Sequence, residues 1–176
     1  SPFEIVGAPS TVSMTVAVQA MQAIGPAKEV LYFTKSKTLG TAETLVDRFF
    51  IVIDGGKDID ALRDFYGKLG GQTSPVMPTR MTVLNEALGL AGETEHPLAV
   101  ARVNGSFMVE LDQYPEAVKE RGVRSGDLPP CMAMVTIATD ALPAAGVSLK
   151  GVIAHGDKSA VIRSPSGALI ELIERR

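Results

Sequence analysis

The final stretch of the chain, Ala160–Arg176, constrains the fold most, because it contains two extended segments and the turn that joins them. The turn is Ser164-Pro165-Ser166-Gly167, and Pro and Gly at these places are typical of a turn between antiparallel strands. The second segment, Ala168–Ile173, is apolar except for Glu171. A buried carboxylate is costly unless it is paired, so either the Glu171 face of this strand meets water or the carboxylate has a partner.

Two earlier phrases resemble this second segment, Gly25–Thr34 and Asn104–Asp112. Each contains an apolar run and is preceded by residues typical of a turn. The chain therefore reads as a repeated strand-rich unit, and we expect each phrase to be the last strand of one unit.

Composition limits the function classes. A chain of 176 residues with a formal net charge of −3 is one domain or two small ones, and this charge gives no reason to expect nucleic acid or an acidic membrane as partner. The single cysteine, Cys131, excludes an internal disulfide framework, and its apolar neighbours predict a buried structural thiol. No apolar run is long enough to span a bilayer and the N-terminus has no signal-peptide pattern, so we expect a cytoplasmic domain.

The central part of the chain, residues 45–113, has the fullest pattern of elements, in the order β-α-β-(α)-β-β. Asp58 is a good N-cap, and apolar residues at helical spacing follow it until Gly70-Gly71. Asn104-Gly105 between two apolar runs predicts a hairpin. The expected elements are strand Arg48–Ile53, helix Ile59–Leu69, strand Thr73–Met77, helix Arg80–Leu90, and strands Leu98–Val103 and Phe107–Leu111.

The flanking parts are predicted from the same signals. Residues 1–40 contain strand-like runs at Phe3–Val6, Thr11–Val18 and Glu29–Thr34. Residues 114–130 form a linker, with a short helix expected at Pro115–Arg121. Residues 131–176 repeat the central order, with strand Met132–Ala138, a short helix near 141–145, strand Val152–His155 and the final hairpin.

Three local matches resemble the vicinal oxygen chelate superfamily, which includes glyoxalases, bleomycin-resistance proteins and extradiol dioxygenases. The first match is to the first strand and helix of its βαβββ module, and it consists of Asp47–Ile53 followed by Asp58 and Phe65–Gly70. The second match, Ser164–Leu172, resembles the closing hairpin of the module. The third, Phe107–Asp112, resembles the same closing strand more loosely. The resemblance implies a mixed α/β (α+β) fold in which modules 45–113 and 131–176 face one cup that holds the ligand. Residues 1–40 are then the tail of a preceding incomplete module. Its unpaired strand edges lead us to expect that residues 1–35 complete a sheet with a second copy in a homodimer.

The resemblance also implies where a metal would bind, namely at a residue of each first strand, usually His, and a Glu of each last strand. Here the last-strand positions are Glu110 and Glu171, with Tyr32 at the equivalent place in the incomplete module. Arg48 stands at one first-strand position, and Met132 or a near neighbour stands at the other. Since guanidinium stays charged, Arg48 would repel a cation and attract an anionic or carbonyl-bearing ligand.

We therefore expect Arg48, Glu110, Met132 and Glu171 to contact a small oxygenated or anionic molecule, without a tightly bound transition metal. The alternative is a metal-dependent lyase, isomerase or dioxygenase, for which a divalent metal is possible. Simpler roles also stay open: the two glutamates could face solvent or pair with Arg102 and Arg163, Arg48 could lie on the surface, and Met132 and Met134 could be core residues. His96 and His155 fall outside the first strands.

Overall fold

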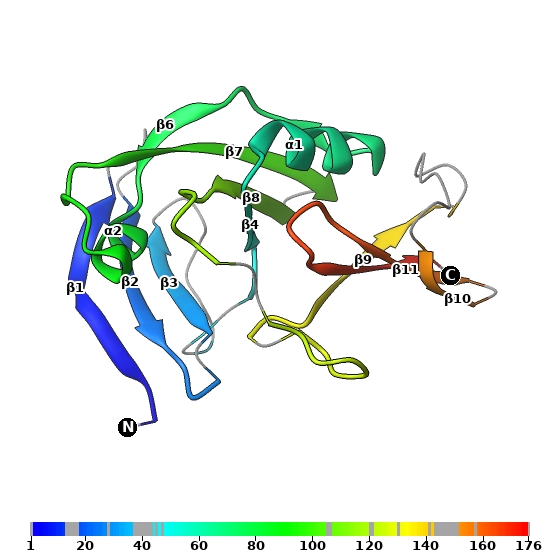
Figure 1. Cartoon of the computed structure of the whole chain (residues 1–176), viewed down its shortest axis with the longest axis horizontal. Helices are drawn as coiled ribbons and strands as arrows, with labels where there is room; N and C mark the ends of the chain where they lie inside the picture. The colour runs from blue at the N-terminus through cyan, green and yellow to red at the C-terminus, as the bar shows by residue number, and fades with distance from the viewer. Residues whose placement is uncertain are drawn as a thin grey trace.

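The computed structural model describes residues 2–12, 18–27, 29–36, 44, 46, 48–104, 107–119, 122–129, 131–140, 142, 152–156 and 158–175. Within these ranges the chain forms a three-stranded, a five-stranded and a four-stranded sheet together with two helices (Figure 1). None of the described helices is long and apolar enough to span a membrane.

The N-terminal sheet is an antiparallel meander of β1 (Glu4–Val12), β2 (Val18–Ile24) and β3 (Val30–Ser36). The prediction of one strand over Thr11–Val18 is wrong, because Val12 and Val18 pair with each other across β1 and β2 and the chain reverses between them.

The five-stranded sheet is built by the central part of the chain. Its order is β4-β8-β7-β5, with β6 also paired to β7, and β4 runs parallel to β8. The predicted N-cap is confirmed, since the Asp58 carboxylate accepts a hydrogen bond of 2.9 Å from the Ala61 amide. The elements are β4 (Ile51–Gly56), α1 (Ile59–Lys68), β5 (Gln72–Thr73), β6 (Met77–Arg80), α2 (Thr82–Leu88), β7 (Glu95–Asn104) and β8 (Phe107–Gln113).

The C-terminal sheet repeats this pairing pattern with β9 (Met134–Thr139), β10 (Val152–His155), β11 (Ser159–Arg163) and β12 (Leu169–Glu174) in the order β10-β11-β12-β9. Its first and last strands, β9 and β12, run parallel, as β4 and β8 do. The predicted hairpin is present, and Gly167 has φ 87, a left-handed conformation that favours glycine. In the linker, the described residues 115–119 form a turn instead of a helix, and the helix expected near 141–145 falls largely outside the described residues.

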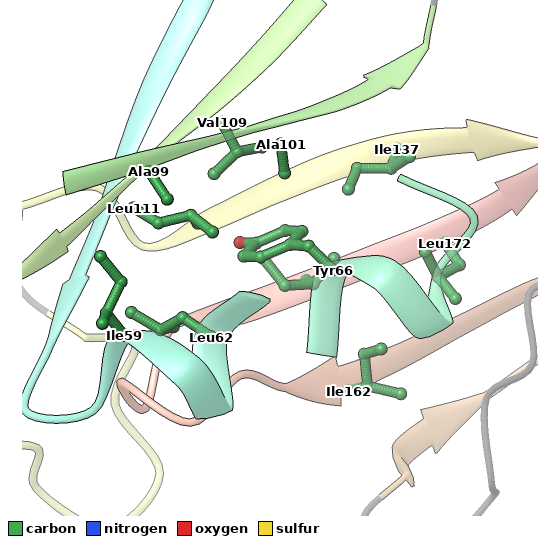
Figure 2. Packing of buried hydrophobic residues seen from close by; sticks show 11 residues of the cluster. Ile59, Leu62, Tyr66, Ala99, Ala101, Val109, Leu111, Ile137, Ile162 and Leu172 are labelled. Carbon is green, nitrogen blue, oxygen red and sulfur yellow. The ribbon is translucent and has the colours of Figure 1, made fainter. Parts of the chain in front are cut away.

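Helix α1 lies between the five-stranded and the C-terminal sheets (Figure 2). Its residues Ile59, Leu62 and Tyr66 pack in one core with side chains from both sheets. The partners are Ala99 and Ala101 of β7, Val109 and Leu111 of β8, Ile137 of β9, Ile162 of β11, and Ile170 and Leu172 of β12. The mixed α/β fold is confirmed, and this shared core joins α1 to side chains of both sheets.

A buried polar contact ties the same two sheets together. Asp54 of β4 is 2% exposed and accepts a hydrogen bond of 2.8 Å from the Tyr66 hydroxyl of α1 and a second from the Ser166 hydroxyl of the final hairpin. Burial, together with the neighbouring Asp54 charge, raises the pKa of Tyr66, so the phenol stays a donor.

Candidate functional site

Strand β8 separates the core from the candidate site. Successive side chains of a strand point to opposite faces, and Val109 and Leu111 point into the core beside α1. Glu110 and Asp112 therefore point to the other side of the five-stranded sheet. We call this side, which carries Glu110 and Asp112, the acidic face.

The neighbours of the two carboxyls on this face follow from the strand register. Val100 of β7 and Ile53 of β4 flank Glu110. Leu98 of β7 and Gly55 of β4 flank Asp112. Both carboxyls thus lie among apolar side chains, which strengthens their electrostatic interactions with any group placed beside them.

Gly55 has a specific packing role at this face. A Cβ added there would lie 2.1 Å from Cζ of Tyr114, so the tyrosine ring covers the glycine. Position 55 accepts no larger residue unless Tyr114 moves. The ring therefore closes one end of the acidic face, next to Asp112.

Tyr32 reaches the acidic face from β3 of the N-terminal sheet. Partial burial raises the pKa of its phenol, and the charges of Glu110 and Asp112 act in the same direction. Such electrostatic coupling requires proximity, so the structure brings together Tyr32 and Glu110, which the sequence pattern had placed at equivalent positions of two units. Tyr32 is 44% exposed, which leaves its side chain accessible.

Asp112 is the most perturbed group at this face. It is 5% exposed, and its Oδ1 atom is buried without a hydrogen-bond partner in the part of the chain that the structure describes. Burial first, and then the charges of Glu110 and Asp54, raise the pKa of Asp112 to about 8. Burial also raises the pKa of Glu110. The Asp112 carboxyl therefore holds its proton at neutral pH and can donate as well as accept.

The position of Arg48 follows from where β4 starts. The residue is exposed and lies ahead of β4, which begins at Ile51. The β4 side chains that point to the same side as Glu110 are Ile51 and Ile53. The β4 side chains beside Glu110 are thus apolar.

Glu171 and Met132 lie at the other sheet. Ile170 and Leu172 point into the core, so Glu171 points away from α1, and Thr136 Oγ1 donates a hydrogen bond of 2.6 Å to its carboxylate. Met132 is half-buried and precedes β9. The two glutamates occupy equivalent strands on opposite sides of the shared core and do not form one site.

Other side chains named from the sequence also have defined surroundings. Met134 is 41% exposed, so it is not a core residue. Cys131 is exposed, with φ 65, so the prediction of a buried thiol is wrong; the chain bends there before β9 begins. Arg163 donates a hydrogen bond of 2.9 Å to the Gly167 carbonyl within the hairpin. His96 is buried on β7, with Nε2 2.7 Å from Asn85 Oδ1.

The donor set at the acidic face does not fit a transition metal. Two carboxyls and a phenol are present, while the neighbouring first-strand positions carry isoleucines. Among the described residues no three His, Cys, Asp or Glu side chains gather to hold a metal ion. Zinc, iron and nickel sites usually include imidazole or thiolate ligands.

Sequence reasoning identified Glu110 and missed Asp112 as its companion. The signal was available, because residues two apart on one strand share a face and Glu110 was already assigned to the site. The side of the sheet on which Tyr32 would lie depended on how the N-terminal sheet packs, which no local pattern specifies.

Comparisons with known proteins identify the fold. No family model matches the sequence, and no curated protein sequence matches it. A glyoxalase family protein from Bacillus cereus is similar in structure with a TM-score of 0.56 and 16% identity, covering 77% of this chain and 98% of that protein. Glyoxalase I from Leishmania major has a TM-score of 0.50 and 15% identity, covering 72% of this chain and 86% of that one.

Glyoxalase I from Zea mays matches over 98% of this chain, with a TM-score of 0.63 and 16% identity. The chain spans 59% of the length of that enzyme. Identities at this level establish the fold and not the activity. The chain has a glyoxalase-like α+β fold.

Proposed function

We propose that this chain is a glyoxalase-like domain that binds a small oxygenated molecule at the acidic face, through its own side chains instead of a transition metal. The supporting observation is the buried, unpartnered Oδ1 of Asp112 beside Glu110 and Tyr32. A buried acceptor without a donor is unfavourable by about 1–3 kcal/mol, so a ligand hydroxyl or amine that reached it would be strongly held.

The charge of this face argues against an anionic ligand. The sequence-based expectation of an anionic ligand depended on Arg48, which lies ahead of β4 in an exposed position. Two carboxyls in an apolar setting would repel an anion whenever either is ionised. A protonated Asp112 can instead donate to a ligand carbonyl, which retains the oxygenated class of ligand.

The alternative is a metal-dependent lyase, isomerase or dioxygenase. The similarity in fold to the glyoxalase I enzymes of Leishmania major and Zea mays favours it. The donor set argues against it, because apolar Ile51 and Ile53 stand beside Glu110 where a ligand residue would be needed.

Elemental analysis after incubation with Ni, Zn, Fe and Mn salts separates the two proposals. We expect substoichiometric metal in the unmodified protein. Ile53→His places an imidazole directly opposite Glu110 and should increase metal uptake, while Arg48→His, the matched control ahead of the strand, should not. Stoichiometric metal in the unmodified protein would refute the metal-free proposal.

Ligand binding is tested by NMR titration of isotope-labelled protein with a panel of small oxygenated compounds. Compounds that bind should shift the amide signals of β3 and β8. The Glu110→Gln variant should bind these compounds more weakly. Binding that shifts only signals remote from these strands would contradict the assignment of the site to the acidic face.

A further inference from the structure

The acidic face offers three oxygen groups from two sheets to one region. Glu110 and Asp112 share a face of β8, and Tyr32 of β3 interacts electrostatically with both. Two carboxyls on one strand face, with a phenol coupled to them electrostatically, match a donor with several hydrogens. A primary ammonium group has three such hydrogens and a positive charge.

The ion pairs found among the described residues involve Asp60, Asp64, Glu93 and Asp140, and none includes Glu110 or Asp112. On the same side of β7, Arg102 stands opposite Met108 and is exposed, and His96 is already bonded to Asn85. The other titratable groups near Asp112 are Asp54, Tyr32 and Tyr114, which add no positive charge.

The side chains around the carboxyls indicate that the rest of the ligand is apolar. Val100, Ile53 and Met108 are the apolar neighbours of Glu110 on this face. A transition metal would find neither imidazole nor thiolate among these groups. An ammonium group attached to an apolar body would satisfy the carboxyls and cover the apolar side chains together.

We propose that the small oxygenated molecule held at the acidic face carries a primary ammonium group on an otherwise apolar body, with Glu110, Asp112 and Tyr32 as the oxygen partners of the ammonium group. This inference rests on the proposed function, which places the small-molecule site at this face. A bound cation favours ionised carboxyls, so binding displaces the proton that Asp112 otherwise retains. Binding should therefore release protons and strengthen as the pH rises from about 6 to about 8.

Three probes of similar shape test the charge requirement: 2-phenylethylamine, 2-phenylethanol and phenylacetate. We expect 2-phenylethylamine to bind at least about tenfold more tightly than the alcohol, and phenylacetate to bind most weakly. Calorimetry in buffers of different ionisation enthalpy should detect proton release for the amine alone. Asp112→Asn should weaken amine binding at least about tenfold, while Asp127→Asn, the same charge change at an exposed position, should leave it unchanged.

The outcomes distinguish this inference from the proposed function. If the alcohol binds at β3 and β8 as tightly as the amine, the ammonium inference fails and the small-molecule site stands. If the amine binds elsewhere, or if none of the probes binds at millimolar concentration, the ammonium inference also fails. The proposed function itself would be refuted if none of the oxygenated compounds of the broader panel shifted the amide signals of β3 and β8.

Discussion

Replacing Asp112 with asparagine should make the stability of this fold less sensitive to alkaline pH. The folded chain holds a proton on Asp112 up to about pH 8, whereas the unfolded chain releases it near the ordinary pKa of 3.8. Between these values the folded state binds more protons than the unfolded state. Stability then falls as the pH rises, and it stops falling above about pH 8.

The magnitude follows from the pKa difference. Each pKa unit corresponds to about 1.4 kcal/mol, so a rise from 3.8 to about 8 corresponds to on the order of 5 kcal/mol across the window. Native domains are stable by about 5–15 kcal/mol, so this single carboxyl would be a major determinant of alkaline stability. Asparagine is neutral at every pH in this range and resembles the protonated acid, so the variant avoids the loss.

The assay is urea denaturation of both proteins at several values between about pH 5 and pH 9. The difference between their free energies of unfolding cancels the titration of all other groups and should grow in favour of Asp112→Asn as the pH rises. Asp127→Asn serves as the control because Asp127 is exposed. A difference that stays constant over this range would refute the reasoning, because it would mean that Asp112 ionises in the folded protein as it does in the unfolded chain.

Two further predictions address the packing and the assembly of the chain. Tyr66→Phe removes the hydroxyl that donates to the buried Asp54 carboxylate, and should destabilise the fold by about 1–3 kcal/mol in urea denaturation; a change within experimental error would show that Asp54 finds another donor. Ile5 and Phe33 of the N-terminal sheet and Phe3, just ahead of it, are exposed and fit the expected homodimer. Light scattering should then give twice the 18.6 kDa chain mass at micromolar concentration, and a stable monomer would contradict the expectation.

The sequence determined the local elements of this protein because their signals lie within a few residues. Asp58 caps α1 through its own hydrogen bond to Ala61, and the Ser164–Gly167 turn forms because Gly167 adopts a positive φ. The repeat of one unit was also visible in the sequence, and it appears as the same pairing pattern in the five-stranded and C-terminal sheets. Such features depend on backbone preferences that the adjacent residues fix.

Only the tertiary structure decided which faces meet. Apolar residues line both sides of β4 and β7, so their pattern does not say which side packs against α1 and which carries a site. The packing of α1 between two sheets placed Glu110 and Glu171 on opposite sides of one core. Likewise, the electrostatic coupling of Tyr32 to Glu110 depends on how separate sheets pack, and interactions between segments this far apart leave no periodic signal in the sequence.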